Sequence, residues 1–190
     1  MQQIKYLVLS VLMLSTLLVQ AQEKTSRKKE KKGKYFIAFN LIGLTSVGEN
    51  SNFVIGGKGG FYLGKRVFLG GRAAGIALNE RYFPEVEAPE FGYIGPMVGV
   101  HLWRKERLQA SLLGATGLGI VDYTIDRRSI RDRTLFIMPS AEVEYFFSKN
   151  VAVGMELGYR RVSRTSLPFT AKQLSGLEFG ISLKLGRRPL

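Results

Sequence analysis

Large apolar residues alternate with small or polar residues over several stretches of the chain. The clearest stretch is VAVGMELGYR at residues 151–160, in which large apolar residues share one parity and mostly glycine, alanine and charged residues share the other. A β-strand points successive side chains to opposite faces, so the stretch is predicted to be a two-faced strand. The pattern fits two architectures. A soluble barrel or sandwich buries the apolar face, whereas a membrane barrel turns that face toward lipid.

From residue 34 onward the chain divides into strand-like segments separated by turn signals, without a convincing amphipathic helix. The eight segments span approximately residues 34–45, 52–63, 66–78, 91–103, 107–121, 134–147, 151–162 and 174–186. Tight polar turns alternate with longer connections at 45–51, 79–90, 122–133 and 163–173. This alternation is typical of a barrel with short turns at one rim and long loops at the other. The predicted fold class is all-β, an eight-stranded antiparallel up-and-down barrel.

Segment length and aromatic placement favour a barrel that crosses a membrane. Most segments reach the roughly nine to eleven residues that a tilted transmembrane strand needs. Aromatic residues collect near segment ends, and we interpret them as two belts at the membrane interfaces, the alternative being a core packed at strand ends. One belt is expected to hold Tyr35, Phe36, Phe61, Tyr62, Phe68, Trp103, Tyr145, Phe146 and Phe147. The other is expected to hold Phe53, Tyr82, Phe83, Phe91, Tyr93, Tyr123, Phe136 and Tyr159.

A membrane barrel places its polar parity in the lumen, where glycines leave room for long charged side chains. The predicted lumen charge network consists of Lys58, Arg72, Glu142, Glu144, Glu156, Arg160, Glu178 and Lys184, with Asn40 and His101 as further lumen candidates. Unpaired charges in a confined interior are costly, so carboxylates and cations are expected to pair and to fill the lumen. We therefore expect no general porin. A purely structural network and a narrow ion path remain open alternatives.

The N-terminus is predicted to be a signal peptide over residues 1–21. A charge-free apolar run is followed by VQAQ, with Val19 and Ala21 in the positions of a cleavage site. The alternative is an uncleaved anchor, because the positive charge directly after the site tends to stay cytoplasmic. Residues 22–33 are predicted to be a basic periplasmic tether, and residues 34–187 the barrel. The chain has no cysteine, which excludes a disulfide framework and a lipoprotein anchor.

The chain resembles the small eight-stranded outer-membrane β-barrels of the OmpA/OmpX type, including porin-like barrels of Bacteroidetes. The most specific part is EFGISLKL at residues 178–185, which is similar to the C-terminal signal read by the barrel-assembly machinery. Its key positions are Glu178, Gly180, Leu183 and Leu185. The usual terminal aromatic is absent because the chain continues as GRRPL. The resemblance implies a transmembrane barrel in the outer membrane of a Gram-negative bacterium.

Two prolines and one segment depart from the regular pattern. Pro96 and Pro139 fall inside expected strands, where each removes a donor from the hydrogen-bond ladder. A closed barrel has no free edge at which to place them, so we predict a β-bulge at each. The third segment, VFLGGRAAGIAL, has poor parity and is the least regular of the eight.

Basic residues gather in the loops expected at the outer rim. This outer-loop basic rim comprises Arg127, Arg128, Arg131, Arg133, Arg161, Arg164 and Lys172. Arginine forks bind phosphates bidentately, so we expect contact with outer-membrane lipid and lipopolysaccharide. Two alternatives remain, namely ordinary solvated loop charge and pairing with the carboxylates of the loop at 79–90, which are Glu80, Glu85, Glu87 and Glu90.

Other function classes are less well supported. The net charge of +13 invites a nucleic-acid interpretation, but the basic residues are scattered over loops and tether, so no nucleic-acid partner is expected. His101 is the single histidine and no metal-ligand spacing or cofactor motif is present, so no metal or cofactor is expected. A lipid A-modifying enzyme is the first alternative, although Ser111 and Glu156 cannot be assigned as partners of His101. A soluble lipocalin-like barrel is the second. We expect a monomeric, non-enzymatic barrel with a structural or surface-interaction role.

Overall fold

A computed structural model describes residues 35–47, 50–63, 65–78, 87–163, 165 and 169–186. The predicted signal peptide at residues 1–21 and the predicted tether at 22–33 lie outside the described residues, as does Arg164. Among the helices of the described part, none is long and apolar enough to cross a membrane.

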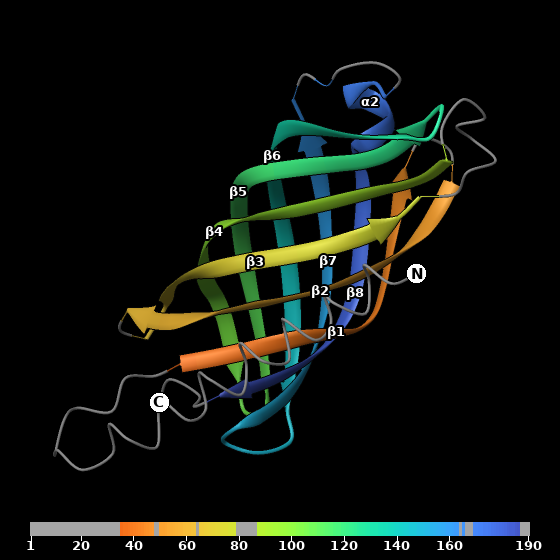
Figure 1. The fold of residues 1–190 in the computed structure, drawn as a ribbon. Helices are drawn as coiled ribbons and strands as arrows, with labels where there is room; N and C mark the ends of the chain where they lie inside the picture. Colours follow the sequence, from red (N-terminus) through yellow and green to blue (C-terminus); the bar gives the residue numbers. More distant parts are fainter. Residues whose placement is uncertain are drawn as a thin grey trace, which may run out of the picture. The chain divides into compact units, whose positions relative to one another are not determined.

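The described chain forms a closed barrel in which each strand pairs with the next along the chain (Figure 1). The eight strands are β1 (Tyr35–Val47), β2 (Asn50–Leu63), β3 (Val67–Ala77), β4 (Glu87–Lys105), β5 (Leu108–Ile125), β6 (Arg128–Phe146), β7 (Val151–Val162) and β8 (Gly176–Gly186). Antiparallel pairing of β1 with β8, from Phe36↔Gly186 to Thr45↔Glu178, closes the barrel. The predicted all-β up-and-down fold is confirmed.

The connection between β5 and β6 differs from the prediction. Residues 122–133 were expected to form a long loop, but both strands continue to a turn at Asp126 and Arg127. These two residues have φ of 48° and 63°, the left-handed conformation that a two-residue hairpin turn of type I′ requires. The prediction of a loop was wrong because the polar residues here pair across strands. The outer rim therefore carries a long hairpin.

The connection between β7 and β8 contains a short helix, α2 (Ala171–Leu174), which lies at the end of the barrel opposite the β6–β7 turn (Figure 1). Thr170 and Gln173 form a capping box, in which each side chain accepts a hydrogen bond from the backbone of the other. Leu174 is fully buried. The helix thus turns an apolar side chain into the barrel, although no helix was expected in this segment.

Side chains alternate between the two faces from Ser129 to the end of β6 and throughout β7. Two local irregularities place consecutive apolar side chains outside. Between Asn40 and Ile42 the register of β1 shifts, and Leu41 and Ile42 are both exposed. Between His101 and Trp103 the register of β4 shifts in the same way, and Leu102 and Trp103 are both exposed. These shifts have the character of β-bulges, in which one extra residue re-aims the side chains that follow.

The prediction of bulges at Pro96 and Pro139 was wrong. Pro96 pairs with Gly71 and Pro139 pairs with Gly114 without any shift of register. Each proline instead interrupts pairing on its other side. Pairs of β6 with β7 pass from Ile137↔Arg161 to Ser140↔Gly158 in the same register, with no pair at Pro139. The ladder of β6 with β7 therefore lacks the two pairs at Met138 and Pro139, and the register on either side of the gap is unchanged.

Two facing glycines allow β4 and β5 to approach each other closely. Gly95 of β4 and Gly117 of β5 face each other, and a Cβ on either would collide with the backbone of the opposite strand. Side chains are thus excluded from this point of the wall. The strands that contain this pair turn strongly around the barrel (Figure 1).

Candidate functional site

A layer of charged side chains crosses the lumen. Its members come from β2, β3, β6, β7 and β8, and none is more than 6% exposed. Lys58 Nζ donates to Glu142 Oε1 at 2.5 Å and to Glu156 Oε2 at 2.7 Å. Arg72 pairs with Glu156 and, at 2.7 Å, with Glu178. A short chain of ion pairs therefore links strands on opposite sides of the barrel.

Arg160 continues this chain toward the end that carries α2. Its Nη1 lies 2.7 Å from Glu178 Oε2, and its Nε donates to the carbonyl oxygen of Leu174 at 3.1 Å. The guanidinium also lies over the rings of Phe91 and Tyr93, 5.2 and 5.6 Å from their centroids. Such cation–π contacts help to compensate a buried cation for lost water. Arg160 thus joins the charged layer to α2 and to the aromatic residues beyond it.

A second group of polar residues lies toward the short-turn end. Lys184 Nζ lies 2.5 Å from Glu144 Oε1, and Gln109 donates to the other oxygen of Glu144 at 2.8 Å. The amide of Gln109 also lies 3.0 Å from Nδ1 of His101, which in turn lies 2.8 Å from Ser111 Oγ. The structure thus brings His101 and Ser111 together. Glu156 is absent from this group and belongs to the central pairs.

The charges in the lumen balance. The predicted network, all of it described, has four carboxylates and four cations, and each makes at least one ion pair. Pairing is needed because a buried charge without a partner costs several kcal/mol. A few polar atoms find no hydrogen-bond partner among the described residues, namely Gln109 Oε1, Glu142 Oε2, Arg160 Nη2 and Ser182 Oγ. The structure places all eight residues of the predicted network inside the barrel, as the polar parity indicated.

Apolar side chains close the lumen on both sides of the charged layer. Toward the long-loop end lie Phe91, Tyr93, Tyr123, Phe136, Phe169 and Leu174. The ring of Phe169 meets that of Tyr123 edge-on, with centroids 5.3 Å apart. Toward the short-turn end Phe36, Tyr62 and Phe68 pack against each other, and Lys184 Nζ lies 4.2 Å from the centroid of Phe36. The lumen is filled along its length by these three layers.

This arrangement corrects the prediction of two lipid-facing aromatic belts. Several residues assigned to the belts point into the barrel, namely Phe36, Phe68, Phe91, Tyr93, Tyr123, Phe136 and Phe146. Strand parity carried the missing signal, because Phe136 and Phe146 share the parity of Glu142 and Glu144. The alternative of a core packed at strand ends holds for these residues. Tyr82 and Phe83 lie outside the described residues.

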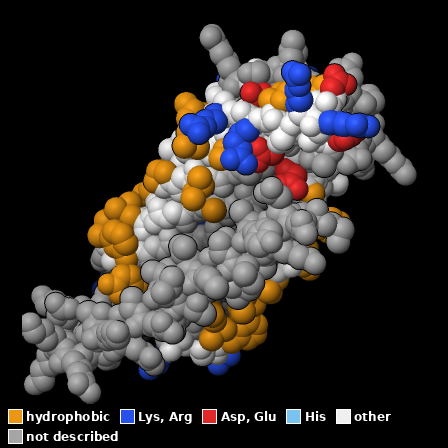
Figure 2. All heavy atoms as spheres, viewed as in Figure 1, with side chains coloured by type: hydrophobic (Ala, Val, Ile, Leu, Met, Phe, Trp, Pro, Cys, Tyr) orange, Lys and Arg blue, Asp and Glu red, His pale blue; other side chains and the backbone are white. Residues whose placement is uncertain are grey.

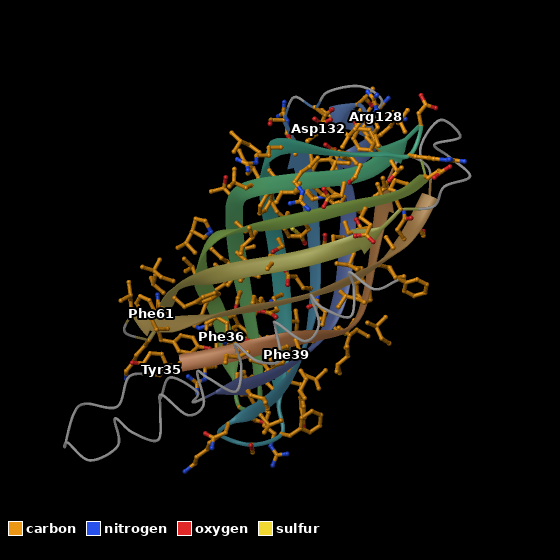
Figure 3. The ribbon with its side chains drawn as sticks, in the orientation of Figure 1. Tyr35, Phe36, Phe39, Phe61, Arg128 and Asp132 are labelled. Atoms are coloured by element: carbon orange, nitrogen blue, oxygen red, sulfur yellow. The ribbon has the colours of Figure 1, made fainter. Side chains whose placement is uncertain are left out.

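Other aromatic residues do face outward. They are Tyr35, Phe61, Trp103, Tyr145 and Phe147 toward the short turns and Phe53 and Tyr159 toward the other rim. Figure 3 shows Tyr35 and Phe61 at the end of the barrel opposite to Arg128 and Asp132. Each rim thus combines outward aromatics with an inward aromatic layer.

The predicted basic rim is spread over the long-loop end. Arg127 and Arg128 lie at the tip of the β5–β6 hairpin, and Lys172 lies on α2. Arg131 makes two hydrogen bonds with Asp122 on the outer face, at 2.7 and 3.1 Å. Arg133 and Arg161 are exposed on the outer faces of β6 and β7. On the face shown in Figure 2, charged side chains gather at this end and hydrophobic ones along the sides.

The remaining predictions for the rim concern ion pairs of its cations and the carboxylates of the loop at residues 79–90. Arg131 is the only member of the rim that makes an ion pair within the described residues. Glu87 and Glu90 pair with β5 through the backbone ladder, whereas Glu80 and Glu85 lie outside the described residues. Among the described residues, the rim cations are not brought into one pocket.

The predicted assembly signal lies on β8. Glu178 and Gly180 face the lumen, where Glu178 belongs to the charged layer. Leu183 and Leu185 have the opposite parity, and Leu185 is 44% exposed. The sequence motif therefore corresponds to a strand with a polar inner face and an apolar outer face.

The family model described as outer membrane protein beta-barrel domain matches residues 8–185. No curated protein sequence matches the chain. Among solved structures, neisserial surface protein A is similar with a TM-score of 0.63 and 12% identity, over 80% of this chain and 96% of that one. Ail, the attachment invasion locus protein of Yersinia pestis, is similar with a TM-score of 0.55 and 12% identity, over 82% of this chain and 99% of that one. These identities indicate a shared fold.

Proposed function

Since the chain belongs to the family of outer-membrane β-barrel domain proteins, we propose that it is a closed, non-enzymatic barrel whose outer rim binds phosphate groups of lipopolysaccharide. Barrels of this kind place short turns in the periplasm and longer connections outside the cell. The β5–β6 hairpin and α2 then lie at the outer end. The basic residues at this end face the leaflet that carries the phosphorylated glycolipid.

The observation that carries the proposal is the order of residues on the outer faces of β6 and β7. Leu135 and Tyr159 are exposed apolar positions, and the next outward positions toward the outer rim are Arg133 and Arg161. Both arginines therefore lie just beyond the apolar surface, at the level where lipid phosphates meet the barrel wall. A guanidinium binds phosphate bidentately and keeps its charge at any physiological pH.

The filled lumen supports an interaction role over a channel role. Charged and aromatic layers occupy the interior, and Lys58, Arg72 and Arg160 are each held by a carboxylate. Eight-stranded barrels have an interior just wide enough for side chains to fill. We therefore expect no steady conductance when the purified protein is inserted into a planar lipid bilayer.

The placement of His101 and Ser111 supports a non-enzymatic role. Both side chains face the lumen near the short turns and are 7% and 2% exposed. A nucleophile that cleaves lipid A would have to reach ester bonds in the outer leaflet. The lipid A mass spectrum of cells with and without the protein tests this expectation. A change in acyl-chain composition that depends on His101 would contradict it.

The binding experiment compares two double variants with the same change of charge. Arg133→Gln with Arg161→Gln removes the outer cations, and Arg107→Gln with Lys149→Gln removes exposed cations from two periplasmic turns. Binding of lipid A and of dephosphorylated lipid A to the detergent-solubilised barrel is measured for each. The outer variant is expected to bind lipid A about tenfold more weakly and to lose the preference for the phosphorylated form. Equal binding by both variants would overturn the proposal.

Three further expectations complete the proposal. The signal peptide is expected to be cleaved near Ala21, which the intact mass of protein from washed outer membranes tests. Insertion is expected to require the barrel-assembly machinery through Glu178, Gly180, Leu183 and Leu185. A monomer is expected in detergent, which sedimentation velocity tests.

A further inference from the structure

A hollow lies on the lipid-facing wall across β5 to β8. It is a shallow, open depression with a volume of about 410 Å³. The walls are formed by Leu112, Leu157, Tyr159 and Leu177, all of which project outward. Pro139, Ser140 and Gly158 form much of its floor. The hollow is therefore apolar and opens toward the membrane.

Gly114 of β5 borders the hollow, because it pairs with Pro139 of the floor. Tyr159 likewise pairs with Leu177. The register of β6 with β7 places Pro139 level with Tyr159 although the two residues do not pair, so these four positions lie in one row across the strands. A Cβ placed on Gly114 would find nothing within 4 Å. The large side chains at one end of the row therefore stand beside open space at the other end.

The hollow lies directly below the basic rim. Arg161 follows Tyr159 on the outer face of β7, roughly 7 Å farther along the strand at two residues' rise. It pairs with Ile137 of β6, so the row next to the hollow contains an exposed guanidinium. The apolar hollow and the guanidinium of Arg161 are thus adjacent. Their order along the barrel wall matches that of the acyl chain and the phosphorylated headgroup in a lipid.

We propose that this hollow binds an acyl chain of lipid A while Arg161 binds a phosphate of the same molecule. The proposal rests on the proposed function, because Arg161 belongs to the phosphate-binding rim. A flexible acyl chain can follow an open depression of this shape and make dispersion contacts that a smooth wall cannot offer. One outer-leaflet lipid is then held at two points.

A second copy of the barrel is a less suitable occupant. A symmetric dimer buries the same patch of both copies. The contact would bring Arg161 of one copy close to Arg161 of the other, since the arginine borders the hollow. Like charges brought together beside lipid repel each other with little screening. Lipid A supplies the opposite charge instead.

The test adds a large side chain at the edge of the hollow without disturbing the barrel. Gly114→Leu adds a side chain where the structure has open space, and Ala73→Leu adds the same side chain to an exposed position of β3 as the control. Leu157→Ala, which removes a wall of the hollow, is a second test variant. Heat-modifiable migration on gels verifies that each variant is folded. Native mass spectrometry then measures binding of lipid A, of dephosphorylated lipid A and of phosphatidylglycerol.

The expected result is that Gly114→Leu and Leu157→Ala each weaken lipid A binding about fivefold, while Ala73→Leu binds like the unchanged protein. Unchanged binding by both test variants overturns the acyl-chain site, even where the arginine variants lose binding. Loss in the test variants alone, with the arginine variants unaffected, keeps the acyl site and overturns the phosphate rim. Equal affinity for phosphatidylglycerol overturns the assignment to lipid A. A dimer that disappears with Gly114→Leu overturns the site in favour of a second copy.

Discussion

Two walls of the barrel differ in their regularity and in the sign of the charges that they place in the lumen. The wall formed by β6 to β8 alternates regularly and carries all four carboxylates of the layer, together with Arg160 and Lys184. The wall formed by β2 and β3 is rich in glycine and carries Lys58 and Arg72. These two cations are direct cross-strand partners, as are Glu142 and Glu156 on the other wall.

Like charges directly opposite each other on neighbouring strands destabilise a sheet. In this barrel they are neutralised across the lumen, because Lys58 contacts both Glu142 and Glu156. The backbone ladder therefore holds neighbouring strands together, and the ion pairs hold opposite walls together. The like-charged neighbours Lys58 and Arg72, and Glu142 and Glu156, are thus neutralised only when the barrel closes, whereas Arg160 with Glu178 and Lys184 with Glu144 pair within the wall formed by β6 to β8.

The largest expected effect comes from removing the cations of the glycine-rich wall. Lys58→Met combined with Arg72→Met leaves Glu142 and Glu156 next to each other without the cations that neutralise them. The cost should exceed about 5 kcal/mol, which is comparable with the whole stability of many proteins. We expect the folded, heat-modifiable band to disappear. A folded band of normal intensity would show that the two walls do not depend on each other.

A smaller loss is expected from the opposite wall. Glu156→Gln removes a carboxylate that accepts from Lys58, Arg72 and Ser140. Its partners keep Glu142 and Glu178, so the loss should be about 3–5 kcal/mol, as for a broken buried pair. Urea unfolding in detergent, followed by gel migration, measures the change. A loss below about 1 kcal/mol, the size of an ordinary hydrogen bond, would contradict a central role for Glu156.

Replacing one charge on each wall sharpens the comparison. Lys58→Met with Glu142→Leu removes one cation and one carboxylate together, and Glu156 keeps Arg72 as a partner. Matched apolar replacement of a buried pair is often neutral, so we expect a change within about 1 kcal/mol. Lys58→Met alone serves as the reference in the same unfolding experiment. A double variant no more stable than the single one would mean that the charge balance is unimportant.

The smallest effect is expected at the rim. Asp122→Asn removes the carboxylate that pairs with Arg131 on the exposed outer face. Solvent screens such a pair, so the unfolding midpoint should not change measurably. The freed guanidinium should instead strengthen lipid A binding slightly. A clear loss of stability would show that the hairpin contributes to closure of the barrel.

Strand parity accounts for most of what could be predicted from the sequence. Regular alternation in β6, β7 and β8 predicts both the fold and the side on which Glu142, Glu156 and Glu178 lie. Glycine-rich β3 offers little contrast between its faces, yet Arg72 could be assigned to the lumen because a charge does not face lipid. Which cation meets which carboxylate could not be predicted, because the pairs join strands far apart in sequence.

Predictions from local sequence patterns were wrong where contacts between strands or across the lumen determine the structure. A proline in a strand suggests a bulge, but at Pro139 the ladder with β7 lacks only the pairs at Met138 and Pro139, and the neighbouring pairs keep the register. The polar run at residues 122–133 suggests a loop, but a two-residue turn at Asp126 and Arg127 converts it into a hairpin. Aromatics at strand ends suggest membrane belts, but the lumen of a small barrel also needs large side chains to fill it.

The balanced lumen has a consequence for the electric field around the protein. Four cations and four carboxylates of the described residues cancel inside the barrel, so these eight side chains add nothing to the formal charge of +13 of the full sequence. Fields from exposed charges extend only about 8 Å at physiological ionic strength. Ionic strength should therefore control the attraction of the barrel for anionic surfaces, while the ion pairs that brace its walls remain insensitive to added salt.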